Sequence, residues 1–395
     1  MSLTAAVGIS NATDGREAGL HATRQALDQL GRGPVVFGWL IASHTFPIQQ
    51  VLSGASDLLG DAPLLGFSTS AELTSSGRAR RSVSVALLSA DDVQARAGWW
   101  PDFVQDSRMC SQNMLSGLQP DVEAGEVLLT VADGFNGDAT HLCAALSALA
   151  CPAAGCLAGG ELWRGRTYQV GGRQHGSGGL AGAVLSGNVV IGVGAAHGWK
   201  PVGALTRLSR VQGQWVRMLD NHPASETYEQ YFGYPAREWA YPPLSEMARL
   251  YPLGIHEEGA LFVRSPLRIE VDGSLRMNTL LPEGRVADLL VGSQTGCRQA
   301  ADQAVRQALA SLGPTRPRLA VVLVDAAWQT MLELDPQAEV QAVRQALGAD
   351  VPIIGGYTYG QTMRDNPRSP VQLLNQHMLV ILFGVKKVEL DGVVA

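Results

Sequence analysis

Three segments of the chain share a glycine that is followed by small and hydroxyl-bearing side chains and then by an acid or an amide. They read PLLGFSTSAEL at 63–73, PAAGCLAGGEL at 152–162 and PIIGGYTYGQT at 352–362. Aligned on Gly66, Gly155 and Gly355, they place Glu72, Glu161 and Gln361 at one position. A carboxylate accepts hydrogen bonds from an ammonium or hydroxyl group, and amide and hydroxyl side chains add neutral hydrogen bonds. The pattern therefore predicts the binding of a small polar ligand.

Each segment follows an apolar run that reads as a buried strand. In open α/β sheets, ligands bind beyond the carboxyl ends of the strands, where loops diverge and backbone amides stay unpaired. The candidate ligand-binding residues are Ser68, Thr69, Ser70, Glu72, Glu161, Tyr357, Thr358, Tyr359 and Gln361. The alternative is that the glycines permit tight turns and the polar side chains cap the local backbone. If the turns are functional, we expect them to converge on one cavity between the two halves of the chain.

The motifs of common enzyme classes are absent from the sequence. The only lysines are Lys200, Lys386 and Lys387, and none stands in the Gly-Lys pair that a P-loop requires. The sequence has no Gly-x-Ser-x-Gly elbow, and the glycines after Val190 lack the dinucleotide-binding spacing. The 5 cysteines are irregularly spaced and read as reduced, buried thiols without a zinc site. We therefore expect a protein without catalysis of its own, without a metal and without a cofactor.

One enzymatic alternative stays open. Asp133 and Asp325 fall at the ends of two buried strands at equivalent places, as paired acids in a duplicated active site would. Aspartates at strand ends also cap turns, so the same two residues fit a purely structural role.

The elements that must position these residues recur along the chain. RQALDQLG at 24–31 precedes the apolar run 35–42, and RQALASLG at 306–313 precedes the apolar run 319–327. A weaker copy has its strand at 127–134 and its helix at about 138–150. The repeated unit is helix–strand–helix–strand–turn–strand, with a parallel crossover and a strand that runs back antiparallel. The sequence predicts an α/β protein with mixed sheets flanked by helices.

The length of 395 residues predicts two domains. Residues 221–254 are rich in aromatics and prolines, and we interpret them as a short helix at 224–232 and an ordered linker. The domains expected on either side are residues 1–220 and 255–395. The net charge of −6, without a basic run, argues against nucleic acid and anionic membranes as partners. No signal peptide or membrane span is visible in the sequence, so we expect a cytoplasmic protein.

These segments, in this order, resemble a known family. IIGGYTYGQT followed by LLNQHMLVILFG resembles the C-terminal half of FIST proteins, as do PLGI at 252–255 and LPEGRVADLL at 281–290. GFSTSAEL, AAGCLAGGEL, HGWKPVG and the run that begins LTRLSRVQGQW resemble the N-terminal half. The resemblance spans roughly residues 30–385. It adds Asn375, which opens the last strand of the pattern, to the ligand-binding candidates.

The resemblance implies a sensory protein that binds a small ligand, such as an amino acid, and signals through a separate kinase, cyclase or chemoreceptor. Some family members bind haem and respond to nitric oxide, which makes a haem sensor the second hypothesis. An axial histidine in an apolar pocket would be required, and His197 and His256 are the candidates. This chain has Gln361 where the family usually has Glu and His377 where Thr is common.

Overall fold

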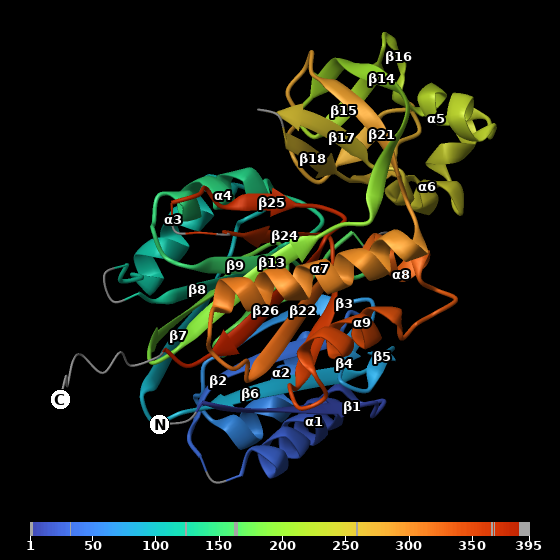
Figure 1. Ribbon diagram of the computed structural model, residues 1–395. Helices are drawn as coiled ribbons and strands as arrows, with labels where there is room; N and C mark the ends of the chain where they lie inside the picture. The colour runs from blue at the N-terminus through green and yellow to red at the C-terminus, as the bar shows by residue number, and fades with distance from the viewer. Residues whose placement is uncertain are drawn as a thin grey trace, which may run out of the picture.

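The computed structural model describes residues 3–31, 33–122, 125–161, 165–257, 260–364, 366 and 368–386. Within these ranges the chain forms four β-sheets with helices packed on them (Figure 1). The predicted class, mixed sheets flanked by helices, is confirmed. No helix of the described residues is long and apolar enough to cross a bilayer.

The first three sheets are built by three units that share one order of elements. The first unit contains β1 (Thr4–Ser10), α1 (Gly15–Leu30), β2 (Val35–Ser43), α2 (Ile48–Leu59), β3 (Leu64–Thr69), β4 (Glu72–Thr74), β5 (Gly77–Ala79) and β6 (Val83–Ser89). The second contains β7 (Val93–Trp100), α3 (Ser107–Leu118), β8 (Val127–Ala132), α4 (Ala139–Ser147), β9 (Ala153–Leu157), β10 (Gln169–Gly171), β11 (Gln174–Gly176) and β12 (Leu180–Gly187). The third contains β13 (Val190–Ala196), α7 (Gln294–Leu312), β22 (Leu319–Asp325), α8 (Ala326–Met331), α9 (Ala338–Leu347), β23 (Ile353–Thr358), β24 (Gly360–Met363), β25 (Gln372–Leu374) and β26 (Met378–Gly384).

Each unit pairs its central strands in the same way. β2 runs parallel to β3, β8 to β9 and β22 to β23, as a strand–helix–strand crossover requires. On the other side of each central strand lies the antiparallel return strand, which is β6, β12 or β26. Helix α1, which leads into β2, has ordinary sequence signals: the side chain of Asp14 accepts hydrogen bonds from two backbone amides at its start, and Gly31 ends it at a φ of 81°.

The hairpin after each turn joins the sheet of a different unit. The β4–β5 hairpin of the first unit pairs with β23 of the third, β10–β11 of the second with β3 of the first, and β24–β25 of the third with β9 of the second. The exchange is cyclic: each unit contributes one hairpin to the sheet of another unit, and its own sheet contains one hairpin from a different unit. It brings the three turns between these strands to a common place.

The alternation of side chains along the central strands explains how the three sheets pack. One set of residues, such as Trp39, Leu129 and Val321, forms an apolar core that the sheets enclose together. The residues next to them, such as Leu40, Leu128 and Val322, face the helices on the outside. Both faces of each strand are therefore buried, and these strands read as continuous apolar runs rather than alternating ones.

The fourth sheet belongs to residues 199–292, which lie between β13 and α7 and which we call the inserted module. Its elements are β14 (Trp199–Gln212), β15 (Trp215–Leu219), β16 (His222–Pro223), α5 (Ala224–Phe232), η2 (Ala236–Ala240), α6 (Leu244–Met247), η3 (Ala248–Leu250), β17 (Leu253–Glu257), β18 (Ala260–Arg264), β19 (Pro266–Ile269), β20 (Leu275–Met277) and β21 (Val286–Gly292). It stands at one end of the molecule, beyond β24 and α8 (Figure 1).

The segment 221–254 lies inside this module. Its helix α5 has the bounds expected from the sequence, Ala224–Phe232. Tyr228 and Trp239 are fully buried and pack at 5.1 Å between ring centroids, in an apolar cluster with residues of β14, β15 and β21. The boundaries expected at residues 220 and 254 therefore do not coincide with the ends of the module, because the third unit begins before it, at β13.

Candidate functional site

The three glycine turns meet at one end of the enclosed core. A ring of hydrogen bonds joins them: Gly159 N donates to Ser68 O (2.9 Å), Tyr359 N to Leu157 O (2.9 Å), and Tyr357 N to the side-chain Oγ1 of Thr69 (2.8 Å). No residue larger than glycine fits at position 159, because a Cβ atom on Gly159 would lie 2.0 Å from the carbonyl oxygen of Tyr357. The close approach of the turns is thus a property of their small residues and of the exchanged hairpins.

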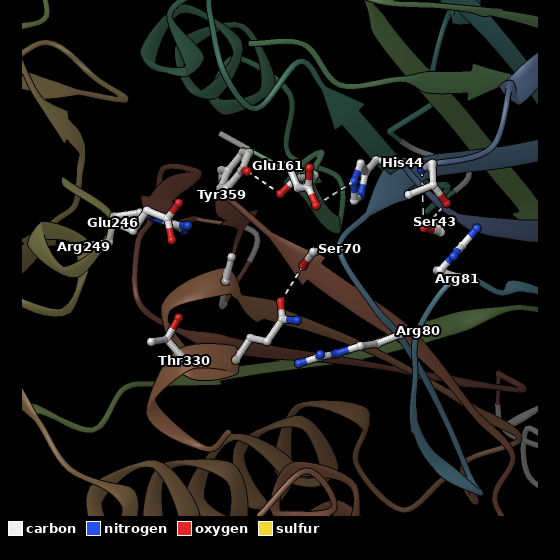
Figure 2. Close-up of a pocket in the computed structure, with 14 residues that line it drawn as sticks. Ser43, His44, Ser70, Arg80, Arg81, Glu161, Glu246, Arg249, Thr330 and Tyr359 are labelled. Atoms are coloured by element: carbon white, nitrogen blue, oxygen red, sulfur yellow. Dashed lines mark hydrogen bonds and ion pairs between the residues drawn. The ribbon is translucent and has the colours of Figure 1, made fainter. Parts of the chain in front are cut away.

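A polar cavity of about 450 Å³ opens above this meeting point (Figure 2). Its lining comes from the ends of strands in all three units and from the inserted module. The lining residues are Ser43, His44, Thr45, Ser70, Arg80, Arg81, Gly160, Glu161, Glu246, Arg249, Ala326, Gln329, Thr330 and Tyr359. The carboxyl ends of the central strands therefore do surround the cavity, as parallel α/β strands predict.

His44 lies in the wall of the cavity directly after β2. Its Nδ1 atom is 3.1 Å from the carbonyl oxygen of Thr69, so Nδ1 must carry a proton and donate. The Nε2 atom lies 3.4 Å from Oε1 of Glu161, which follows β9. The His44 side chain is 6% exposed and that of Glu161 is 42% exposed, so the carboxylate reaches solvent while the imidazole does not.

Hydroxyl and amide groups line the floor of the cavity. Ser70 Oγ donates to Oε1 of Gln329 at 2.5 Å, and the hydroxyl of Tyr359 donates to the carbonyl oxygen of Gly160 at 2.5 Å. Gln329 sits here because Asp325 caps the start of α8 by accepting from Ala327 N, so the helix begins as soon as β22 ends. Burial raises the pKa of Tyr359, which keeps its hydroxyl protonated.

Arginines stand at the two sides of the cavity (Figure 2). The guanidinium of Arg249 lies 4.8 Å from the centroid of the Tyr359 ring, and its NH2 atom lies 3.6 Å from Oδ1 of Asp325. Arg80 pairs with Glu333 at 2.6 Å. Arg81 is exposed and has no hydrogen-bond or ion-pair partner among the described residues. The cavity thus offers one unpaired and one loosely paired guanidinium.

Comparison with known proteins places the chain in a family. Residues 36–222 match the FIST N domain, and residues 224–364 match the FIST C domain. The chain belongs to the FIST family. FIST domains are sensory domains implicated in signal transduction. The two matches meet between residues 222 and 224, within the inserted module of this FIST protein.

No curated protein matches the chain. Among solved structures, chorismatase is 13% identical with a TM-score of 0.38, and the match covers 97% of this chain and 99% of that one. Cyanuric acid hydrolase from A. caulinodans is 12% identical with a TM-score of 0.27, over 47% of this chain and 71% of that one. PurL of T. maritima is 11% identical with a TM-score of 0.25, over 97% and 73%. Likenesses this weak carry no argument about the activity of the FIST protein.

Of the sequence-predicted ligand residues, Ser70, Glu161 and Tyr359 line the cavity. The other predicted residues are buried and do not line the cavity, and their side chains form hydrogen bonds with other groups of the protein. Ser68 Oγ donates to Gly159 O, Ser82 donates to the carboxylate of Glu72, the hydroxyl of Tyr357 donates to Glu339, Gln361 Nε2 donates to Thr358 Oγ1, and Asn375 Nδ2 donates to Tyr359 O. Thr69 Oγ1 accepts from the third turn, as described above. These side chains hold the turns in place.

The strand register corrects the sequence alignment of the acid and amide position. Glu72 pairs with Gly356 and Gln361 with Cys156, and the residue of the second unit at the same register is Gln169, opposite Phe67. Glu161 precedes that strand and points into the cavity instead. The error arose because the second turn is longer than the other two. Burial raises the pKa of Glu72 to about 8, so at this register all three side chains are uncharged at pH 7.

The aspartates of the enzymatic alternative both accept backbone N–H groups. Asp133 accepts from Phe135 N and Asn136 N, and Asp325 accepts from Ala327 N and Gln376 N. Neither lines the cavity. Both side chains thus have the turn-capping partners that the structural interpretation requires.

The histidines of the haem hypothesis lie outside the cavity. His197 packs against His377 at 4.7 Å between ring centroids, and burial lowers the pKa of both rings, that of His377 to about 3. His256 lies on the inserted module with Nε2 2.5 Å from Oδ2 of Asp288. An axial ligand needs a free ring nitrogen that faces a haem-sized apolar space. The surroundings of His197 and His256 do not fit haem.

Sequence reasoning missed His44, Arg81, Gln329 and Arg249. His44 directly follows Ser43, the residue of β2 equivalent in register to Asp133 and Asp325, so alignment of the strand ends could have identified it. Arg249 stands in the segment interpreted as a linker, and no local signal indicates that η3 reaches the cavity.

Proposed function

We propose that this protein is a cytoplasmic, non-catalytic FIST sensor whose ligand is a small charged metabolite such as an amino acid. The observation that carries the proposal is the meeting of three turns, distant in sequence, around one polar cavity of about 450 Å³. That volume lies within the range of small-molecule sites. Side chains from the three units and the inserted module all contribute to it.

The charges around the cavity support a charged ligand. Arg81 and Arg249 can each donate to an oxyanion, and a guanidinium presents two parallel N–H groups to a carboxylate. Glu161 and Glu246 provide carboxylates in the same cavity. A ligand that carries both a positive and a negative charge would form ion pairs with these arginines and glutamates, which neither water nor an apolar molecule can do.

The hydrogen bond made by the Ser70 hydroxyl in the cavity supports binding rather than serine catalysis. A serine nucleophile is activated by a hydrogen bond to a base. The Ser70 hydroxyl donates to the amide oxygen of Gln329, which is not a base. Serine catalysis would require this hydrogen bond to be given up.

The inserted module offers a route for the signal. Glu246 and Arg249 belong to it, whereas the rest of the lining belongs to the three units. A ligand that contacts both parts changes the strength of the attachment between the module and the three units. A separate partner such as a kinase, cyclase or chemoreceptor would detect that change. Such a signal requires the ligand to bind one arrangement of the module more tightly than another.

The test is a thermal-shift screen of the purified protein against a panel of amino acids and small carboxylates. A ligand at a hundredfold excess over its Kd stabilises the folded state by about 2.7 kcal/mol. We expect Arg249→Gln to abolish the shift. Arg306→Gln, at an exposed arginine of α7 paired with Asp302, should leave it intact. Ligand-induced shifts that are equal in wild type and Arg249→Gln would place the site elsewhere.

A further inference from the structure

We propose that His44 and Glu161 form a subsite for a primary ammonium group, and that a proton on Nε2 of His44 competes with that group for the subsite. The inference rests on the proposed function, because it assigns one end of the ligand to one wall of the same cavity. Figure 2 shows the two side chains facing each other at the rim of the cavity, with Arg81 on one side and Arg249 on the other.

The orientation of the imidazole is fixed by the backbone. Nδ1 donates to the carbonyl oxygen of Thr69, so the neutral ring has its lone pair on Nε2. Nε2 is buried and makes no hydrogen bond with any residue that the structure describes, although it points at the cavity and at Glu161. Burying an acceptor without a donor costs free energy, so a proton donor placed there would be bound favourably.

The distance between the two acceptors selects the donor. Nε2 and Oε1 lie 3.4 Å apart, longer than the 2.7–2.9 Å of a charge-assisted hydrogen bond. An ammonium group carries three N–H donors and can donate to both atoms at once, whereas a hydroxyl has one donor. Its positive charge also pairs with the carboxylate of Glu161. The subsite therefore favours a primary amine over an alcohol.

A proton on Nε2 competes with the ligand. Protonated His44 would donate to Glu161 itself and close the subsite, since both acceptors would then be engaged. The other charged groups that face the pair are Arg80, Arg81, Arg249 and Glu246. The arginines stand where the anionic end of the ligand would lie.

The competition determines how the Kd for an amine changes with pH. When Nε2 carries no proton, the Kd for an amine does not depend on pH. When Nε2 carries a proton, that proton must leave for each ammonium that binds, so the Kd rises as the pH falls, by up to about tenfold for each pH unit.

The experiment uses n-propylammonium chloride as the probe, followed by NMR of the full-length protein labelled with ¹³C-histidine. We expect the probe to shift the His44 ring resonance, with a Kd that rises as the pH falls from roughly 8.5 to 5. Glu161→Gln should weaken binding at every pH, because the carboxylate is lost. His44→Gln should remove the pH dependence and keep weaker binding.

The control is a surface pair with the same separation. His222 Nδ1 lies 3.4 Å from Oε2 of Glu226, with its side chain 65% exposed, so His222→Gln should leave the Kd and its pH dependence unchanged. A Kd that stays flat from pH 5 to 8.5, or one unaffected by Glu161→Gln, overturns the inference. Sodium propionate distinguishes the two proposals: if it stabilises wild type but not Arg249→Gln while the amine fails to bind, the sensory cavity stands and the ammonium subsite is wrong. If neither probe binds, both proposals fail.

Discussion

The guanidinium of Arg249 lies over the ring of Tyr359, 4.8 Å from its centroid, and so joins the inserted module to the third turn. Asn278 of the same module donates to the carbonyl oxygen of Tyr359 at 2.8 Å. The module is therefore attached at the residue that also lines the cavity. A ligand that contacts Tyr359 or Arg249 therefore contacts a residue that joins the inserted module to the third unit.

Replacing Tyr359 by Phe tests the contribution of the hydroxyl group to stability separately from that of the aromatic ring. The ring keeps its contact with Arg249, but the hydrogen bond to Gly160 O is lost and that carbonyl group is left without its donor. We expect the free energy of unfolding to fall by about 1–2 kcal/mol. Tyr359→Leu removes the stacked ring as well and should cost more. Urea unfolding of both variants measures this, and equal losses would show that the ring contact contributes nothing.

Glu72 predicts a stability that depends on pH. Burial raises its pKa in the folded protein to about 8, from 4.5. The folded state therefore holds this proton more tightly than the unfolded state does, and the associated stability is full below pH 4.5 and is lost as pH rises to 8. The upper limit of the loss is about 5 kcal/mol, at 1.36 kcal/mol per pH unit.

Glu72→Gln should remove this pH dependence, because the amide resembles the protonated acid and cannot ionise. We expect the variant to gain stability relative to wild type between pH 6 and 9, as measured by urea unfolding at several pH values. Glu238→Gln, at an exposed position of the inserted module, is the matched control and should change nothing. A constant difference between Glu72→Gln and wild type over this range would show that Glu72 is ionised when folded.

The class of fold and the turns could be predicted because their signals are local. The buried strands read as apolar runs, and the glycines of the turns stand at constant distances from them. The exchange of hairpins could not be predicted, since β4, β10 and β24 are short and their sequences do not encode which sheet they join. For the same reason the alignment chose Glu161 over Gln169. Arg249 escaped prediction because its role depends wholly on where the inserted module lies.

The exchanged hairpin β4–β5 is attached to the third unit by a buried ion pair. Arg78 donates to Glu339 at 3.0 Å, and both side chains are at most 2% exposed. The hydroxyl of Tyr357 donates to the same carboxylate. Arg78→Met leaves Glu339 buried without its cation, and we expect a loss of about 3–5 kcal/mol in the free energy of unfolding.

The double variant Arg78→Met/Glu339→Leu tests the cause of that loss. It removes both charges, so much of the stability should return, as a double-mutant cycle from urea unfolding will show. If the double variant is as unstable as the sum of the single variants, the ion pair is not what holds the hairpin.

Two neighbouring glycines in the second turn give the most direct test of how the turns meet. A Cβ atom on Gly159 would lie 2.0 Å from Tyr357 O, a backbone atom that cannot move aside alone, whereas the nearest atom to a Cβ on Gly160 is the Cβ of His44 at 3.4 Å. Gly159→Ala should therefore force the second and third turns apart and destabilise the protein by several times the effect of Gly160→Ala, which we expect to stay within about 1 kcal/mol of wild type. Thermal unfolding of the two variants measures the difference. Because both substitutions add the same methyl group one residue apart, equal stability of the two would mean that the turns do not make the close contact on which the cavity depends.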